Sequence, residues 1–150
     1  KGAKGLVISI LISWYVIESL AAFPFYLTYF NEFAGGPAQG YKYVADSNLD
    51  WGQDLKRLAN YVEKNNIGNI KVDYFGGSSP QYYLGNKYKK LDASDVSQRH
   101  GWLAVSATLL QNGRAQATKG FDQNTTYYRW LDNYEPITQI GYSIFVYKID

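Results

Sequence analysis

The longest apolar stretch of the sequence runs from Leu6 to Phe23 and is followed directly by Pro24, which cannot continue a helix. A helix over residues 6–23 would be about 27 Å long, close to the roughly 30 Å hydrocarbon thickness of a bilayer. Lys1 and Lys4 precede it, and basic residues tend to stay on the cytoplasmic side of a membrane. The stretch therefore predicts a membrane protein, with a transmembrane helix and a soluble part outside the cytoplasm.

Two other interpretations of this stretch stay open, a signal peptide and a buried core helix. A signal peptide shares the basic start and the apolar middle, but the stretch has no clean small-residue cleavage site. Glu18 fits a membrane span poorly because a carboxylate at mid-bilayer is costly, although its position in the last third would bring it near the headgroups or against protein. The chain begins with Lys1 and contains no Met, so we expect it to be a piece of a longer protein.

A second constraint comes from the stretch Tyr41–Leu58, where an extended run meets a polar turn and an amphipathic helix. Residues 41–45 predict a strand. Four apolar residues at helical spacing predict a helix over residues 50–65: Leu55, Leu58, Ala59 and Val62. Asp50 stands in the N-cap position, and Gln53 follows three residues later, where it can reach back to the backbone N–H of the cap. As a cap, Asp50 would have a lowered pKa, since N–H donors stabilise its charged form.

The polar turn over residues 46–54, which we call the elbow, holds candidate ligand-binding side chains. Carboxylates and amides beside an aromatic wall suit a sugar or a phosphate. The candidates in the elbow are Asp46, Asn48, Asp50, Trp51 and Gln53. In the alternative interpretation the elbow is only a well-capped helix start, with Trp51 packed on the first turn.

The next segment, residues 69–75, alternates apolar and polar side chains and predicts a strand. With the 41–45 strand and the helix between them it forms a βαβ unit, so the two strands should be parallel. Further strands are expected over residues 101–110 and 140–149, the second apolar on both sides and therefore central in its sheet. The predicted fold class is α/β: a transmembrane-type helix, then a small mixed-sheet domain that starts with a βαβ unit.

The segments between these strands are predicted to be loops and one short helix. Residues 88–100 and 111–124 are polar and predict loops, whereas residues 127–133 predict a short helix that buries Tyr128 and Leu131.

Ser78 and Ser79 extend the candidate site beyond the elbow. Ser79 and Pro80 form a typical helix start, and Gly85 marks the end of that short helix. Ligands gather at the carboxyl ends of strands in parallel α/β sheets, so the elbow and the 76–79 loop should be neighbours there. The N-termini of two helices would then offer free N–H groups to the same space. A plain turn is the alternative for residues 76–79.

Composition excludes several classes of function. The net charge is +2, from 15 basic and 13 acidic residues, and no dense basic run indicates a nucleic-acid partner. Cysteine is absent and His100 is the single histidine, so disulfides, thiolate metal sites and zinc or iron centres are not expected, and no cofactor is predicted. The 15 tyrosines suit sugar stacking and wet interfaces alike.

Three segments together resemble one known family. They read YLTYFNEFAGGP over residues 26–37, DSNLDWGQDL over residues 46–55 and IGYSIFVY over residues 140–147. The chain resembles the C-terminal end of prokaryotic membrane glycosyltransferases of the dolichyl-phosphate-mannose protein mannosyltransferase type. The resemblance covers nearly the whole chain, and its first two segments are the more specific.

This resemblance implies a division of the chain and a function. Residues 1–34 would be the last transmembrane helix with a membrane-surface segment, and residues 35–150 an extracytoplasmic domain. Enzymes of this family take a sugar from a polyprenyl-phosphate carrier and give it to an acceptor outside the cytoplasm. Their catalytic acidic residue lies in the first outer loop near the N-terminus, so no residue of this chain inherits that role. The expected partners are the membrane, the transmembrane part of the same polypeptide, and a lipid-linked sugar or glycan acceptor.

Two other functions compete with this expectation. The tyrosine content suits a secreted or membrane-anchored carbohydrate-binding module. A small glycoside hydrolase could use carboxylates such as Asp46 and Asp50, but hydrolysis needs one carboxyl group with a raised pKa, and a helix cap would have a lowered one.

Overall fold

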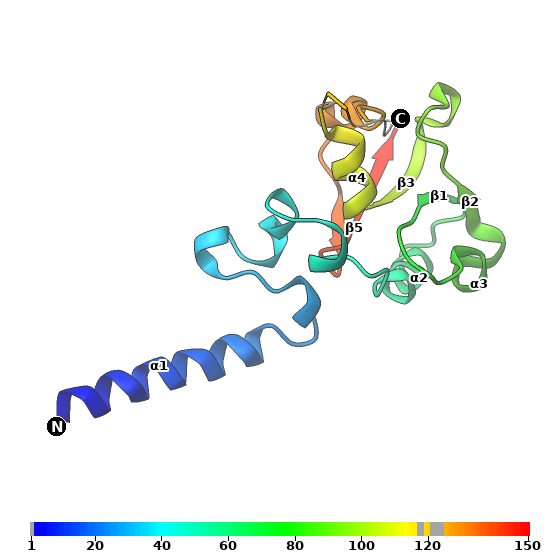
Figure 1. Cartoon of the computed structure of the whole chain (residues 1–150). Coiled ribbons are helices and arrows are strands. Elements are labelled where there is room, and N and C mark those ends of the chain that lie inside the picture. The colour runs from blue at the N-terminus through cyan, green and yellow to red at the C-terminus, as the bar shows by residue number, and fades with distance from the viewer. Residues whose placement is uncertain (1, 117–118, 121–124) are drawn as a thin grey trace.

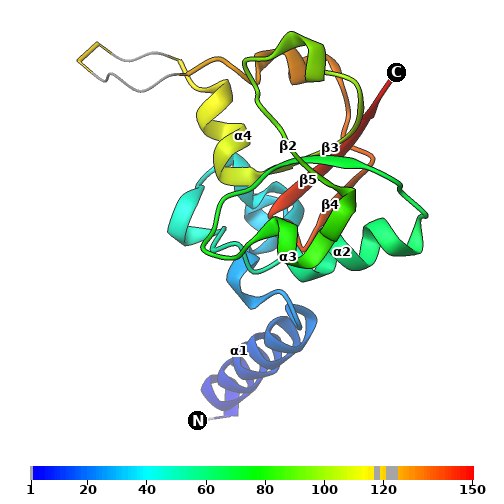
Figure 2. The same cartoon turned by 90° about the vertical axis from the view of Figure 1, so that its right-hand side faces the viewer.

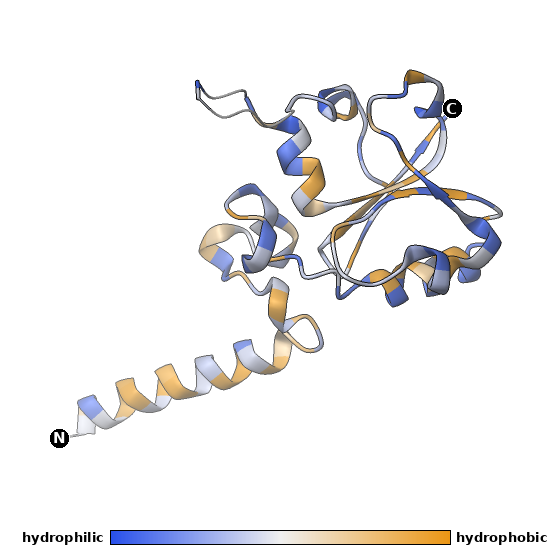
Figure 3. Ribbon diagram, turned by 45° about the vertical axis from the view of Figure 1, so that its right-hand side comes forward, coloured by the Kyte–Doolittle hydropathy of each residue, from blue (hydrophilic) through white to orange (hydrophobic). Residues whose placement is uncertain are grey.

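The structure is a computed structural model that describes residues 2–116, 119–120 and 125–150. Its first element, α1 (Gly2–Ala21), extends away from the rest of the chain (Figures 1 and 2). None of its residues is buried, and apolar residues dominate its length (Figure 3). The helix is long and apolar enough to span a membrane. The alternative interpretation of this stretch as a buried core helix is wrong, because a core helix would bury one face against the domain.

Residues 22–54 form a series of turns rather than a strand. They contain the 3₁₀ helices η1 (Tyr26–Thr28), η2 (Glu32–Ala34), η3 (Pro37–Lys42) and η4 (Asp46–Asn48). The predicted strand over residues 41–45 is therefore wrong. Gly35 and Gly36 adopt left-handed φ angles of 81° and 73° and turn the chain into η3. The carbonyl of Tyr41 accepts a 2.6 Å hydrogen bond from the Gln111 side chain, a partner that the local pattern could not reveal.

The domain is built on one mixed sheet, which confirms the predicted α/β class. Its strands are β1 (Ile70–Asp73), β2 (Tyr88–Lys90), β3 (Gly101–Ser106), β4 (Thr138–Ile140) and β5 (Ile144–Ile149), in the order β2-β1-β3-β5-β4. β1 is parallel to β2 and β3, and β5 is antiparallel to β3 and β4. The sheet does begin with a βαβ unit, but this unit is β1–α3–β2.

Helices cover both faces of the sheet (Figures 1 and 2). One face packs on α2 (Leu55–Lys64) and α3 (Pro80–Leu84), with Leu55, Leu58, Val62 and Leu84 in the core. The other face packs on α4 (Ala107–Arg114) and the 3₁₀ helix η7 (Arg129–Asn133). Tyr128 and Leu131 are fully buried there, as predicted. The short turns η5 (Gly85–Lys87) and η6 (Val96–Gln98) flank β2.

Three element boundaries differ from the prediction. α2 begins at Leu55 rather than at Asp50. The strand predicted over residues 101–110 ends at Ser106, because its partner β5 starts opposite it at Ile144, and the chain turns into α4. The predicted 111–124 loop therefore starts inside a helix, and residues 117–118 and 121–124 of it lie outside the described residues.

Two strands differ as well. The strand predicted over residues 140–149 is a hairpin, since Gly141 and Tyr142 adopt left-handed φ angles of 59° and 67° between β4 and β5. β5 is internal and buried, as predicted. The predicted 88–100 loop contains β2, an edge strand of only three residues, which shows no apolar alternation because Lys89 and Lys90 are both exposed.

Candidate functional site

The carboxyl ends of the parallel strands β1, β2 and β3 form the edge at which ligands bind in open α/β sheets. From β1 the chain reaches β2 through α3, on the face that α2 covers. From β2 it returns to β3 on the opposite face, where Leu91 and Ala93 join the core beneath α4. The connection that leaves β1 and the connection that leaves β2 therefore lie on opposite faces of the sheet. Such a topological switch point leaves a crevice beside the strand ends.

The elbow and the loop after β1 meet at this edge, as the sequence predicted. The hydroxyl of Tyr74 donates a 2.7 Å hydrogen bond to the carbonyl of Gly52. The backbones are in close contact: a Cβ on Gly76 would lie 2.8 Å from the Cα of Gly52. Only glycine fits at Gly52, whose φ is 74° and whose Cβ would lie 2.1 Å from the Tyr74 oxygen. This contact fixes the elbow to the end of β1.

Asp50 lies at the bottom of the elbow and is not the N-cap of α2. Its exposed fraction is 0%, its Oδ1 accepts a 3.0 Å hydrogen bond from the N–H of Gly52, and its Oδ2 has no hydrogen-bond partner among the described residues. Burial raises the pKa of Asp50 to about 6, although the hydrogen bond from the N–H of Gly52 opposes the rise. The predicted lowering of this pKa is therefore wrong, because desolvation outweighs the hydrogen bond.

Asp54 takes the N-cap position of α2, but its side chain does not cap the helix. The buried carboxylate forms an ion pair with Arg57 and accepts a 2.7 Å hydrogen bond from the hydroxyl of Ser143. The guanidinium of Arg57 lies 4.8 Å from the centre of the Phe25 ring. Asp54 thus joins the start of α2 to the β4–β5 turn and, through Arg57, to the segment that follows α1.

The remaining elbow candidates divide into exposed groups and structural groups. Asp46 and Asn48 are exposed, and the N–H of Asp46 donates a 2.9 Å hydrogen bond to Thr108 Oγ1. Trp51 is 62% exposed, and its ring is held by a 2.8 Å hydrogen bond from Nε1 to the carbonyl of Ser47. Gln53 reaches back to the N–H of Trp51 rather than to that of Asp50.

The two serines of the 76–79 loop have different roles. Ser79 caps α3 as predicted, since its Oγ accepts a 3.4 Å hydrogen bond from the N–H of Tyr82. Ser78 is exposed beside it. The structure thus brings the elbow and this loop together, with a buried carboxylate below and an exposed indole at the surface.

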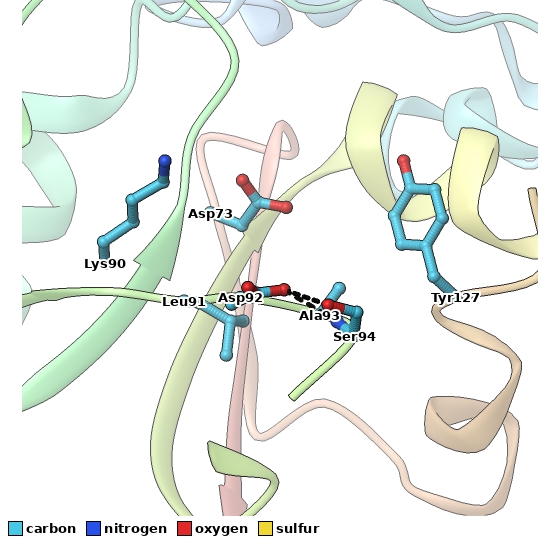
Figure 4. Close-up of a pocket in the computed structure, with 7 residues that line it drawn as sticks. All are labelled: Asp73, Lys90, Leu91, Asp92, Ala93, Ser94 and Tyr127. Carbon is cyan, nitrogen blue, oxygen red and sulfur yellow. Dashed lines mark hydrogen bonds between the residues drawn. The ribbon is translucent and has the colours of Figure 1, made fainter. Parts of the chain in front are cut away.

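A cavity that the sequence did not predict opens at the same edge of the sheet, on the face covered by α4. Its volume is about 310 Å³, and Figure 4 shows its lining: Asp73, Lys90, Leu91, Asp92, Ala93, Ser94 and Tyr127. The side chain of Asp73 is half-buried, and burial raises its pKa, although the 2.7 Å hydrogen bond from the Tyr128 hydroxyl opposes the rise. A polar residue at the end of β1 was the signal available in the sequence.

Within residues 2–116, 119–120 and 125–150, no three His, Cys, Asp or Glu side chains are grouped so that they could hold a metal ion. The groups at the sheet edge are hydrogen-bond donors and acceptors beside aromatic rings, an arrangement that can bind a hydroxylated ligand.

We compared the chain with protein-family models, with curated proteins and with solved structures, and no match was found in any of the three comparisons.

Proposed function

We propose that this chain is the C-terminal extracytoplasmic accessory part of a membrane glycosyltransferase that transfers a sugar from a polyprenyl-phosphate carrier to an acceptor, and that it is not catalytic by itself. The proposal rests on the resemblance of residues 26–37, 46–55 and 140–147 to such enzymes. The observation that carries it is the helix α1, none of whose residues is buried. This apolar surface requires lipid, or the helices of a membrane domain, to cover it.

The segment after α1 supports a position at the membrane surface. Phe23, Tyr26 and Leu27 are exposed although they are large and apolar, and Phe33 is 88% exposed. Aromatic side chains are favoured at the boundary between hydrocarbon and headgroups, because the ring can contact the apolar region while its polar group stays in contact with water. In the proposed arrangement these side chains contact the headgroup region or the transmembrane part of the same polypeptide.

The orientation of the chain follows from the charges that flank α1. Lys1 and Lys4 lie at its start, which would place that end in the cytoplasm and residues 35–150 outside. Because residues 1–150 contain no cysteine, an introduced cysteine is the single thiol when this chain is expressed by itself. In intact cells, a membrane-impermeant maleimide should label Ser78→Cys and leave Lys4→Cys unlabelled until the cells are opened. Labelling of Lys4→Cys alone in intact cells would reverse the proposed orientation.

The transferase part of the proposal is tested in membranes that contain the protein to which this chain belongs. Transfer of a radiolabelled sugar from a polyprenyl-phosphate carrier to the acceptor is measured with and without residues 41–150. We expect deletion to abolish transfer while the transmembrane part still inserts in the membrane. Equal transfer by both forms, at equal protein levels, would refute an accessory role.

A carbohydrate-binding module anchored by α1 is the second candidate, and the exposed but fixed ring of Trp51 favours it. A rigid aromatic face loses little conformational entropy when it stacks on a ligand. In that case the chain should bind glycans without any transferase partner, and Trp51→Ala should abolish this binding. Asp46→Asn and Asn48→Ala test whether the polar groups of the elbow contribute.

A further inference from the structure

The cavity at the ends of β1 and β2 is lined by three charged side chains, of which Lys90 and Asp92 are exposed and Asp73 is half-buried. Figure 4 shows Asp73, Lys90 and Asp92 around the same space, with the ring of Tyr127 on its far side. Three ion pairs join described residues, and none of them includes these three charged side chains. Charged groups that line a cavity without pairing with each other are available to a ligand.

In each of the two carboxylates, Asp73 and Asp92, only one oxygen accepts hydrogen bonds from the protein. Asp73 Oδ2 accepts the hydroxyl of Tyr128, a buried residue that needs this partner. Asp92 Oδ1 accepts both donors of Ser94, the backbone N–H at 2.9 Å and the hydroxyl at 2.6 Å. Neither Asp73 Oδ1 nor Asp92 Oδ2 has a hydrogen bond from any residue that the structure describes. Two acceptor oxygens therefore remain for a ligand.

The charge of the lining narrows the chemical class of that ligand. Two carboxylates against one ammonium group disfavour a phosphate or a carboxylate ligand. The ammonium group of Lys90 disfavours a small cation in turn. A neutral ligand with several hydroxyl groups suits both the carboxylates and the ammonium group, because a hydroxyl can donate to a carboxylate and accept from Lys90. Tyr127 is half-buried and contributes apolar ring surface to the lining, which suits the apolar side of such a ligand.

We propose that this cavity binds a neutral sugar ring, with Asp73 and Asp92 as acceptors, Lys90 as a donor and Tyr127 as the aromatic wall. Its volume of about 310 Å³ is at the lower end of the range for ligand pockets, about 300–1,000 Å³, and suits one ring rather than an extended chain. The inference goes beyond the proposed function, since it rests on the cavity lining and not on the resemblance or on the elbow.

The chain offers a closely matched control for Asp92. Asp95 makes the same local turn, since its Oδ1 accepts the N–H of Ser97 at 2.9 Å and the hydroxyl at 2.6 Å. Asp95 does not line the cavity. Asp92→Asn and Asp95→Asn thus disturb the same kind of turn, and only the first removes a charge from the cavity. Lys90→Ala has an analogous control in Lys89→Ala, which lies on the opposite side of the same strand and outside the cavity.

The experiment uses the full ¹⁵N-labelled chain in phosphocholine micelles, because a detergent with a sugar headgroup would compete. Methyl glycosides of glucose, galactose, mannose and N-acetylglucosamine are added at millimolar concentrations while backbone amide shifts are recorded. We expect at least one of them to give saturable shifts at Asp73, residues 90–94 and Tyr127. Asp92→Asn should weaken this binding about tenfold, the value of a hydrogen bond to a charged group, and Asp95→Asn should not change it.

Four outcomes would overturn the inference. One is the absence of a saturable shift at the cavity with all four glycosides. A second is equal weakening by Asp92→Asn and Asp95→Asn, which would mean that the turn and not the charge matters. The third is a response of the same amides to methylammonium but to no glycoside, which identifies a cation site. Shifts confined to Trp51 and the elbow would also refute this site, while leaving the proposed function intact.

Discussion

Ser143 donates a 2.7 Å hydrogen bond to Asp54 across a separation of 89 positions in the chain, and both side chains are buried. The bond joins the start of α2 to the turn between β4 and β5. The turn approaches so closely that a Cβ on Gly141 would lie 2.0 Å from Asp54 Oδ1. A buried carboxylate is costly unless it is paired and hydrogen-bonded, and here the helix, the turn and Arg57 satisfy it together.

Gly141→Ala should therefore destabilise the domain more than a strained φ angle alone would. The control is Gly101→Ala, because Gly101 also has a positive φ angle, 77° against 59°, but the nearest described atom to its would-be Cβ is the Lys71 ammonium nitrogen at 3.9 Å. We expect Gly141→Ala to cost about 1–3 kcal/mol more than Gly101→Ala. Urea unfolding of both variants measures the difference. Equal losses would show that the turn can move away from Asp54.

The contact between the elbow and β1 gives a second matched pair. Gly52 and Gly101 have φ angles of 74° and 77°, but a Cβ on Gly52 would meet Tyr74 and the Phe75 carbonyl, whereas the nearest described atom to a Cβ on Gly101 would be the Lys71 ammonium nitrogen at 3.9 Å. Gly52→Ala should cost about 1–3 kcal/mol more than Gly101→Ala. It should also move the amide signals of residues 74–76. Unchanged signals there would contradict the close contact.

Local chemistry accounts for the parts of the fold that the sequence predicted. The alternation over residues 69–75 marked β1, the Ser79-Pro80 pair marked the start of α3, and the apolar pattern after Tyr142 marked an internal strand. The meeting of the elbow with the 76–79 loop was predicted from a βαβ unit whose first strand, residues 41–45, the structure does not contain, but the contact between Gly52 and Gly76 is present.

The errors arose where a distant residue determined the local structure. The Gln111 side chain holds the carbonyl of Tyr41, so that segment forms no strand. Asp50 looked like a cap because its neighbours fit a capping pattern, but the approach of Gly52 and Thr108 buries it instead. The cavity beside Asp73 brings together three segments, each of which carries only an ordinary polar residue.

The exposed surface of α1 predicts that the domain folds without it. Deletion of residues 1–21 should leave a domain that is folded and no longer sediments with membranes, because no residue of α1 is buried in the structure. Residues 22–28 are retained because Ala22 and Thr28 are buried. Near-ultraviolet circular dichroism and membrane sedimentation give the two readouts. Loss of the folded signal would mean that α1 belongs to the core after all.

The raised pKa of Asp50 predicts how stability depends on pH. Its pKa is about 6 in the folded chain, against an ordinary value of 3.8, so the folded state binds the proton more tightly than the unfolded state. Between these two values the free energy of unfolding must therefore fall as the pH rises. The contribution of Asp50 is fully present below about pH 4 and is lost as the pH passes about 6, and it amounts to about 3 kcal/mol.

Asp50→Asn removes this titration while it keeps an oxygen for the N–H of Gly52. The loss of stability between about pH 4 and pH 7 should therefore be about 2–2.5 kcal/mol smaller in Asp50→Asn than in the wild type, whatever the absolute stability of the variant. Asp46→Asn is the control, because Asp46 belongs to the same elbow but is exposed, and it should keep the wild-type pH dependence. Urea unfolding at several pH values measures all three proteins. An identical pH dependence of the wild type and Asp50→Asn would mean that Asp50 is ionised in the folded chain at little cost, with its second oxygen reached by water.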